Sequence, residues 1–83
     1  MKARVLVTPK KDIADPQGTA IEQALHELGF AGVHGVRVGK CIELELPDGD
    51  QGVARDALAR MSEKLLANTT IEQYTCVILD GDR

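Results

Sequence analysis

Residues 36–46, Val-Arg-Val-Gly-Lys-Cys-Ile-Glu-Leu-Glu-Leu, decide the fold that the sequence predicts. Apolar and polar residues alternate on both sides of Gly39–Lys40, and this period of two is typical of two strands that meet at a tight turn. On each side of the predicted hairpin lies one segment with helical periodicity, and beyond each helix lies one more strand. The stretch therefore predicts the element order strand-helix-strand, turn, strand-helix-strand.

The loop that closes this hairpin decides which side chains share a face of the sheet. A two-residue turn at Gly39–Lys40, which glycine at the first loop position favours, would pair Arg37 with Ile42. A three-residue loop, or a bulge near Lys40 or Cys41, would instead pair Val38 with Ile42 and separate the apolar from the charged side chains. We favour the second arrangement, which also places Arg37 opposite Glu43.

The first half of the chain carries clear start and stop signals. Residues 3–8 predict a strand, which Pro9 ends because proline has no N–H to give to a ladder. Asp15 and Pro16 predict a helix start, as the N-cap and the first helical residue, and Gly29 predicts a left-handed helix end. The second strand is expected within residues 30–38. The apolar stripe of this first helix consists of Ala20, Ile21, Ala24, Leu25 and Leu28.

The second half repeats this pattern. The loop at 47–52 is rich in turn residues, and either Asp48 or Asp50 can cap the helix that follows. Asn68, which tolerates a left-handed conformation, is expected to end that helix. The last strand should run from about Ile71 to Leu79. The apolar stripe of the second helix consists of Val53, Ala54, Ala57, Leu58, Met61 and Leu65.

These elements predict a single α+β domain over residues 1–83. Each helix is apolar along one stripe, so both helices are expected on the same face of a four-stranded antiparallel sheet. The order β-α-β-β-α-β is the split β-α-β arrangement, ferredoxin-like in outline. Two helices cover only one face, yet Leu6 points away from the side of Val5 and Val7. An uncovered apolar face usually marks an interface, so we expect a homo-oligomer.

Composition narrows the class of function. The net charge is −3, the aromatic residues are one Phe and one Tyr, and no basic cluster occurs, which argues against nucleic-acid binding. No signal-peptide core or membrane-length apolar run is present. Cys41 and Cys76 are isolated and are expected to be free thiols in a reducing compartment. A cytoplasmic protein without nucleic-acid or membrane partners is therefore expected.

The sequence shows no catalytic constellation. No nucleophile stands beside a base, no metal-ligand spacing is evident, and no phosphate-binding loop precedes a helix. His26 falls on the polar side of the first helix, four residues after Glu22, and is expected to be an exposed surface histidine. Gly18 in the first helical turn indicates a close approach of another backbone. We therefore predict no catalytic residue, no metal site and no cofactor in this chain.

Several blocks of the sequence are similar to those of one known family. The blocks are Asp15-Pro16-Gln17-Gly18, Val36-Arg37-Val38-Gly39-Lys40 and Glu63-Lys64-Leu65-Leu66-Ala67-Asn68, in this order and spacing. Together they resemble the PurS family, the small subunit of phosphoribosylformylglycinamidine (FGAM) synthase. The resemblance covers nearly the whole chain and departs mainly at the loop 47–52, at Cys41 and after Leu79.

The resemblance implies a role in the fourth step of purine synthesis. The complex of this family converts formylglycinamide ribonucleotide (FGAR), ATP and glutamine into FGAM, ADP, phosphate and glutamate. The resemblance implies two partners, a glutaminase subunit (PurQ) that releases ammonia and a large synthetase subunit (PurL) that uses ATP and Mg²⁺. The small subunit is then a homodimer or homotetramer that bridges the two and helps ammonia to pass.

The family motifs also imply candidate partner-contact residues. Each has a structural alternative, since helix capping explains Asp15 and Asn68, and a turn explains Gly39. Arg37 and Lys40, at the tip of the predicted hairpin, have the weakest structural explanation and are our main candidates for partner contact. The full set is Asp15, Gln17, Gly18, Arg37, Gly39, Lys40 and Asn68.

A second class of function stays open. The same architecture serves small-molecule regulatory modules that resemble ACT domains, in which a glycine-rich loop between the first strand and helix binds a ligand. Gly18 fits that interpretation as well. Binding of free amino acids would distinguish such a sensor from a synthase subunit.

Overall fold

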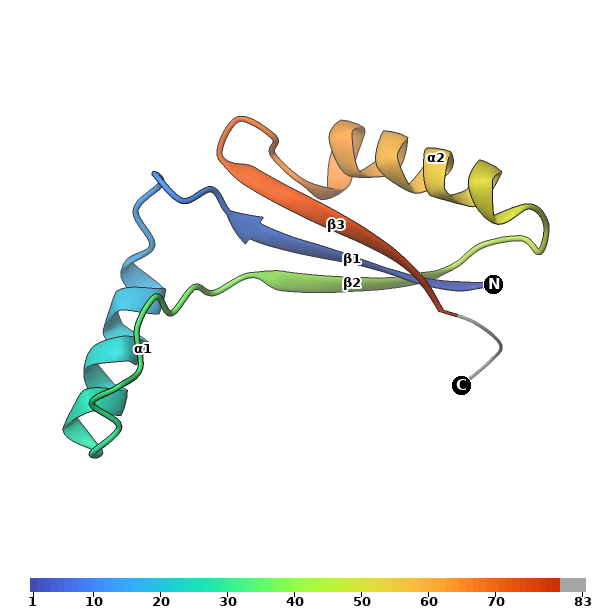
Figure 1. Ribbon diagram of the computed structural model, residues 1–83. Helices are drawn as coiled ribbons and strands as arrows, with labels where there is room; N and C mark the ends of the chain where they lie inside the picture. Colours follow the sequence, from blue (N-terminus) through green and yellow to red (C-terminus); the bar gives the residue numbers. More distant parts are fainter. Residues whose placement is uncertain (80–83) are drawn as a thin grey trace.

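The computed structural model describes residues 1–79, which form three strands, two α-helices and one π-helical turn (Figure 1). In chain order the elements are β1 (Lys2–Pro9), α1 (Pro16–Glu27), β2 (Lys40–Glu45), α2 (Gln51–Met61), η1 (Ser62–Leu66) and β3 (Glu72–Leu79). This is the small α+β domain that the sequence predicts, with its sheet antiparallel throughout.

The sheet of the described chain has three strands in the order β2-β1-β3, not the four that were expected. The central strand β1 is antiparallel to both neighbours, with Leu6 opposite Cys41 on one side and opposite Thr75 on the other. The expected second strand, within residues 30–38, is not part of the sheet. The ferredoxin-like outline is therefore not the observed fold.

The predicted hairpin at Gly39–Lys40 is also wrong, and with it both proposed registers. Lys40–Glu45 pairs with β1 in an unbroken register from Lys40–Val7 to Glu45–Lys2, so the bulge expected near Lys40 or Cys41 does not occur in this pairing. Residues 36–38 lie along α1 instead. Two of their backbone N–H groups are bound by side chains, since Glu22 accepts from Val36 at 3.1 Å and Asp15 accepts from Val38 at 2.8 Å.

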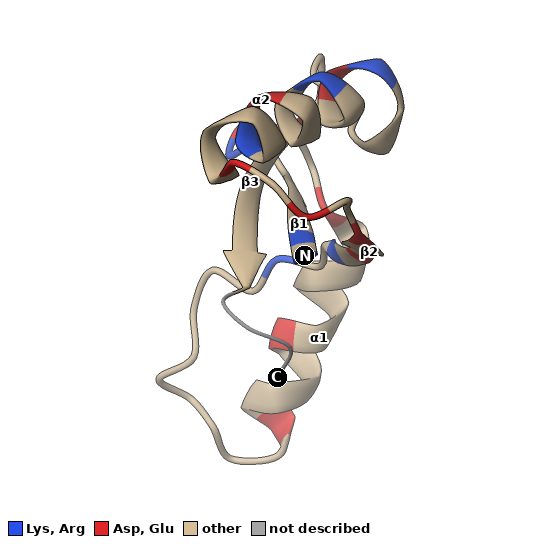
Figure 2. Cartoon of the chain, turned by 90° about the vertical axis from the view of Figure 1, so that its right-hand side faces the viewer, with Lys and Arg blue, Asp and Glu red and all other residues tan. Residues whose placement is uncertain are grey.

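The two helices do not share a face of the sheet. The segment α2–η1 runs along one face, whereas α1 lies beyond the end of the strands and on the opposite side (Figures 1 and 2). The core therefore sits between β1 and α2–η1. Its buried apolar residues are Ala3, Val5, Val7, Leu58 and Ala67.

The π-helical turn at η1 changes which leucine reaches this core. A π turn holds more residues than an α turn, so it shifts the positions that follow it around the helix axis. Leu66 packs against the core, whereas Leu65 is 82% exposed. The stripe predicted for the second helix is thus correct at Ala54, Leu58 and Met61 and wrong at Leu65 and Val53, which is also exposed.

Helix ends follow the predicted signals in three of four cases. Asp15 caps α1 with Pro16 in its first turn, and Asp50 caps α2. Gly29 adopts φ +103°, and Phe30 N–H donates to the Leu25 carbonyl as in a Schellman motif. The fourth prediction is wrong, because no described residue other than glycine has a positive φ, so Asn68 is not a left-handed cap.

The molecule is more extended than a compact domain of its length. Its Cα radius of gyration is 15.9 Å, against about 12 Å expected for a globular chain of this size. The chain is extended because the apolar stripe of α1 does not pack on the sheet. The sheet face opposite α2 is therefore uncovered, and Leu6 on that face is 43% exposed. Within residues 1–79, neither helix has the length and apolar character needed to cross a bilayer.

Candidate partner-contact site

Asp15 connects three parts of the chain at one end of the sheet. Its Oδ1 accepts from the N–H of Gly18 at 3.0 Å, and its Oδ2 accepts from the N–H of Val38 at 2.8 Å. The guanidinium of Arg37 lies 3.9 Å from the same Oδ2. The hydrogen bonds from Val38 and Gly18, together with the nearby Arg37 charge, lower the pKa of Asp15 below its usual value against the opposing effect of burial.

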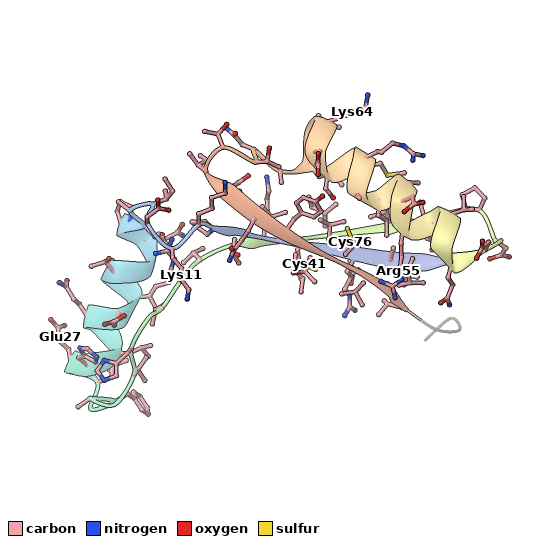
Figure 3. All side chains as sticks on the ribbon, turned by 45° about the horizontal axis from the view of Figure 1, so that its top comes forward. Lys11, Glu27, Cys41, Arg55, Lys64 and Cys76 are labelled. Carbon is pink, nitrogen blue, oxygen red and sulfur yellow. The ribbon has the colours of Figure 1, made fainter. Side chains whose placement is uncertain are left out.

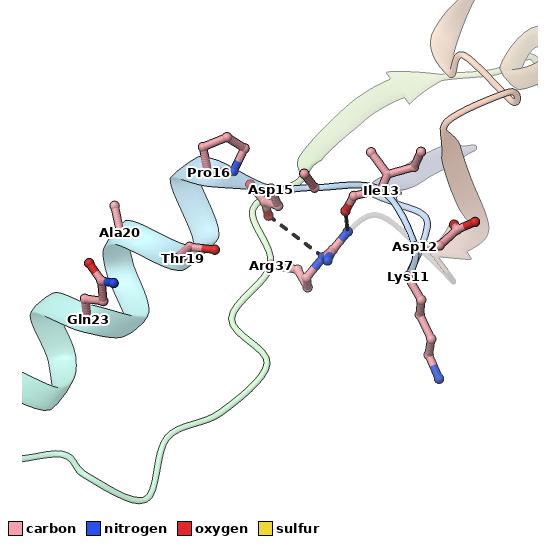
Figure 4. Close-up of a pocket in the computed structure, with 10 residues that line it drawn as sticks. Lys11, Asp12, Ile13, Asp15, Pro16, Thr19, Ala20, Gln23 and Arg37 are labelled. Atoms are coloured by element: carbon pink, nitrogen blue, oxygen red, sulfur yellow. Dashed lines mark hydrogen bonds and ion pairs between the residues drawn. The ribbon is translucent and has the colours of Figure 1, made fainter.

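Arg37 does not lie at a hairpin tip. Its Nη2 donates to the carbonyls of Lys10 at 2.7 Å and Ile13 at 3.0 Å, and so holds the connection between β1 and α1 (Figure 4). This gives Arg37 the structural explanation that the sequence lacked. We call the unit formed by residues 10–18 and 36–39 the junction.

At two positions of the junction, Gly18 and Gly39, another stretch of backbone comes too near to leave room for a side chain. A Cβ atom on Gly18 would collide with the carbonyl oxygen of Val36, and one on Gly39 would collide with the carbonyl oxygen of Val7. The close backbone approach predicted at Gly18 is confirmed, and its partner is the chain segment that returns from α1. Gly39 serves a second close approach rather than a hairpin turn.

Asn68 belongs to a neighbouring turn that is bonded to the junction. Its Oδ1 accepts from the N–H of Thr70 at 3.2 Å, and its carbonyl accepts from the N–H of Ile71 at 3.0 Å. The carbonyl of Ile71 in turn accepts from the N–H of Lys10 at 2.9 Å. Since Arg37 binds the carbonyl of Lys10, a continuous series of hydrogen bonds runs from Asn68 to Arg37.

The structure therefore brings most of the predicted site residues together. Asp15, Gly18, Arg37 and Gly39 form the junction, and Asn68 is joined to it. Lys40 begins β2 directly after the junction, and Gln17 lies in the first turn of α1; both are exposed. The cluster thus has a rigid interior and a polar rim.

An open depression of about 600 Å³ lies beside the junction. One wall is the connection between β1 and α1, and another is the first half of α1, with Arg37 at its edge (Figure 4). In that view the side chain of Lys11 extends away from the guanidinium of Arg37. The other lining residues are Asp12, Ile13, Ala14, Asp15, Pro16, Thr19, Ala20 and Gln23.

The two cysteines are free thiols, as expected. They belong to opposite faces of the sheet near its middle, since Cys41 is paired with Leu6 and Cys76 with Val5 (Figure 3). Cys41 is exposed, and the Sγ of Cys76 lies 3.9 Å from the Oγ of buried Ser62. Neither cysteine is part of the junction.

A second polar cluster was not predicted from the sequence. Glu22, His26 and His34 present ligand-type atoms that all lie within 4.8 Å of one another. Glu22 and His26 are one helical turn apart, and that spacing is visible in the sequence. The approach of His34 to these two residues cannot be read from the sequence, because it depends on residues 30–38 lying along α1 rather than in the sheet.

The fold and the junction describe a small α+β domain with one covered sheet face, one uncovered face and a polar, hydrogen-bonded cluster at one end. A family model described as PurS, phosphoribosylformylglycinamidine (FGAM) synthase, matches residues 2–80. The chain belongs to the PurS family, a family of FGAM synthase subunits.

Individual relatives agree with this assignment. The FGAM synthase subunit PurS of Synechocystis sp. is 46% identical over 71 residues, which cover 86% of this chain and 71% of the relative. The Methanocaldococcus jannaschii PurS structure, described as one of the subunits of formylglycinamide ribonucleotide amidotransferase in the purine biosynthetic pathway, is 31% identical with a TM-score of 0.83, and 98% of each chain is covered. A chain of the Thermotoga maritima PurLQS structure is 31% identical with a TM-score of 0.84, covering 94% of this chain and 95% of its own length.

Proposed function

We propose that this chain is the small, non-catalytic subunit of a cytoplasmic FGAM synthase and bridges its glutaminase and synthetase subunits. The observation that carries the proposal is the match, in sequence and in fold, to a chain of the PurLQS structure over nearly the full length of both proteins. In this role the chain assists the transfer of ammonia from the glutaminase (PurQ) to the synthetase (PurL). The overall reaction converts FGAR, ATP and glutamine into FGAM, ADP, phosphate and glutamate.

Two titratable groups of the described chain have a clearly shifted pKa, and each shift follows from a contact that stabilises the fold. The pKa values that clearly depart from their usual ranges within residues 1–79 are those of Asp15 and Tyr74. Asp15 caps α1 and binds Val38, and Tyr74 donates to the carboxylate of Glu63 at 2.9 Å, which raises the pKa of Tyr74. Both shifts have structural causes. We assign ATP and Mg²⁺ to the partner synthetase on the basis of the family alone.

The junction is the surface that we assign to the partner subunits. Its interior is fixed by the bonds of Asp15 and Arg37, so the backbone that carries its exposed rim has little freedom to lose when a partner binds. Lys40 and Gln17 form that rim, and both side chains are exposed. A rim of this kind suits contact with carboxylates or backbone carbonyls of another subunit.

Self-association is part of the same proposal. The stripe of α1 and the uncovered face of the sheet are both partly apolar and unpaired within one chain. Packing α1 of one copy against the open face of another would bury both surfaces at once. We propose a homodimer or homotetramer built on these faces.

Reconstitution from purified subunits tests the function. Glutamine-dependent FGAM formation should require all three subunits, and omission of this chain should abolish it while the synthetase still uses added ammonium. The chain should also co-purify with both partners. Full glutamine-dependent activity without this chain would refute a bridging role.

The depression beside the junction is the observation that favours the second candidate, an amino-acid sensor resembling ACT domains. It is lined by the connection after the first strand, where such modules bind ligands. Arg37, however, is already engaged by the carbonyls of Lys10 and Ile13. A thermal-shift screen with free amino acids should therefore give no change in Tm, and a clear rise with one amino acid would favour the sensor.

A further inference from the structure

The cluster of Glu22, His26 and His34 lies outside the junction and has no part in the proposed function. Its carboxylate and two imidazoles bring their ligand-type atoms within 4.8 Å of one another. Two ligands of a tetrahedral zinc ion lie about 3.3 Å apart, from metal–ligand bonds of about 2 Å. Small side-chain rotations are therefore enough to close the cluster around an ion, and the side chain of His34 is exposed.

Two of the three side chains are already held by the returning chain in the way that metal ligands usually are. The Nε2 of His26 lies 2.7 Å from the carbonyl oxygen of Val33. A carbonyl can only accept, so Nε2 is the donor, and in the neutral imidazole Nδ1 then carries the lone pair that can bind a metal. A hydrogen bond from the second ring nitrogen to a carbonyl is the usual support of a metal-binding histidine.

Glu22 is anchored by the same returning segment. Its Oε1 accepts from the N–H of Val36 at 3.1 Å, which leaves Oε2 available. The segment that provides both anchors is bent by Gly29 and Gly35, whose φ values of +103° and +68° favour glycine. It brings the ring of His34 to 6.2 Å from that of His26, edge to face.

We propose that Glu22, His26 and His34 bind one divalent transition-metal ion of the zinc class. Two imidazoles and one carboxylate suit Zn²⁺, Co²⁺ or Ni²⁺, whereas Mg²⁺ and Ca²⁺ prefer oxygen ligands alone. Three protein ligands leave the remaining coordination to water. The ion connects α1 to the segment at 30–38. These two parts lie together only in the folded chain, so the ion binds the folded state and stabilises it against unfolding.

Metal binding to the untagged full-length protein tests the proposal. Zn²⁺ affinity is measured by competition with a chromophoric chelator, and Co²⁺ binding by visible absorption. The variants are Glu22→Gln, which keeps an acceptor for the N–H of Val36, and His34→Gln at an exposed position. The control is Glu27→Gln, which removes the same charge from an exposed position on the same helix (Figure 3).

We expect one ion per chain, with affinity about tenfold or more weaker in Glu22→Gln and His34→Gln and unchanged in Glu27→Gln. Zn²⁺ should raise the Tm of the parent protein and of the control, and much less that of either site variant. Equal affinity in all four proteins, the absence of saturable binding, or near-ultraviolet thiolate absorption with Co²⁺ would overturn the proposal. If Glu22→Gln fails to fold, His34→Gln and the Co²⁺ spectrum still decide the question.

Discussion

Asp15 links segments that are 23 residues apart in sequence, since one carboxylate caps α1 and also binds the N–H of Val38. Helix capping alone would need only one of its oxygens. The second oxygen and the neighbouring Arg37 make this residue the centre of the junction. Its ionised form is the one that the junction stabilises.

The pH dependence of stability should reveal this carboxylate. Because the pKa of Asp15 is lower in the folded chain than in the unfolded chain, its contribution is complete above the ordinary aspartate pKa and is lost as the pH falls through the lowered value. Asp15→Asn should therefore be less stable than the parent near pH 7 and lose less stability on acidification. Urea unfolding between pH 7 and 3 measures both; parallel curves would contradict this assignment.

The close approach at Gly39 should make alanine costly there. A Cβ at this position meets the carbonyl of Val7, a backbone atom of the central strand that cannot easily move. We expect Gly39→Ala to destabilise the protein by about 1–3 kcal/mol. Gly49→Ala is the matched control, since nothing lies within 4 Å of its Cβ. Thermal unfolding compares the two, and an equal Tm would remove the steric argument.

Substitution of Lys40 should weaken partner binding, whereas substitution of Arg37 should lower stability. Lys40 is exposed, so Lys40→Glu should change stability by less than about 0.5 kcal/mol yet weaken binding to the partner subunits. Arg37→Gln should lower stability, because it removes the hydrogen bonds to Lys10 and Ile13. Denaturation and a pull-down with both partners separate the effects. Normal complex formation by Lys40→Glu would exclude it from the interface.

Among the elements, η1 decides how the last turn of the second helix meets the core. Leu66→Ala should cost about 1–3 kcal/mol, somewhat less than a fully buried leucine because the residue is half-buried. Leu65→Ala, its exposed neighbour, should cost less than about 0.5 kcal/mol. Urea denaturation at one protein concentration measures both. The opposite order would mean that the helix continues as a regular α-helix.

At the scale of the whole molecule, the uncovered sheet face should control self-association. Leu6→Lys places a charge at its centre and should shift sedimentation at micromolar concentration toward the monomer. Leu65→Lys makes the same change on η1, the segment at the other face of the sheet, and should leave the assembly intact. A parent protein that sediments as a monomer would contradict the proposed oligomer.

The sequence alone determined the local features of this protein. The sequence predicted the first strand at residues 3–8 and the last at about 71–79, and the capping signals at Asp15, Gly29 and Asp50 placed three helix ends. The motif blocks identified the family. These features depend on residues close together in the chain, and the physical cause of the helix ends, capping by a neighbouring residue, is local as well.

The tertiary structure decided what the segment 30–45 does. Alternation in residues 36–38 and 40–45 is equally typical of a hairpin and of two segments that bind other parts of the chain. Which of these forms depends on the acceptors and strands that the rest of the folded chain offers, and these are distant in sequence. The side chains of Glu22 and Asp15 take the N–H groups of Val36 and Val38, which keeps residues 36–38 beside α1, whereas residues 40–45 pair with β1. The same outcome engages Arg37 in the junction and brings His34 to α1.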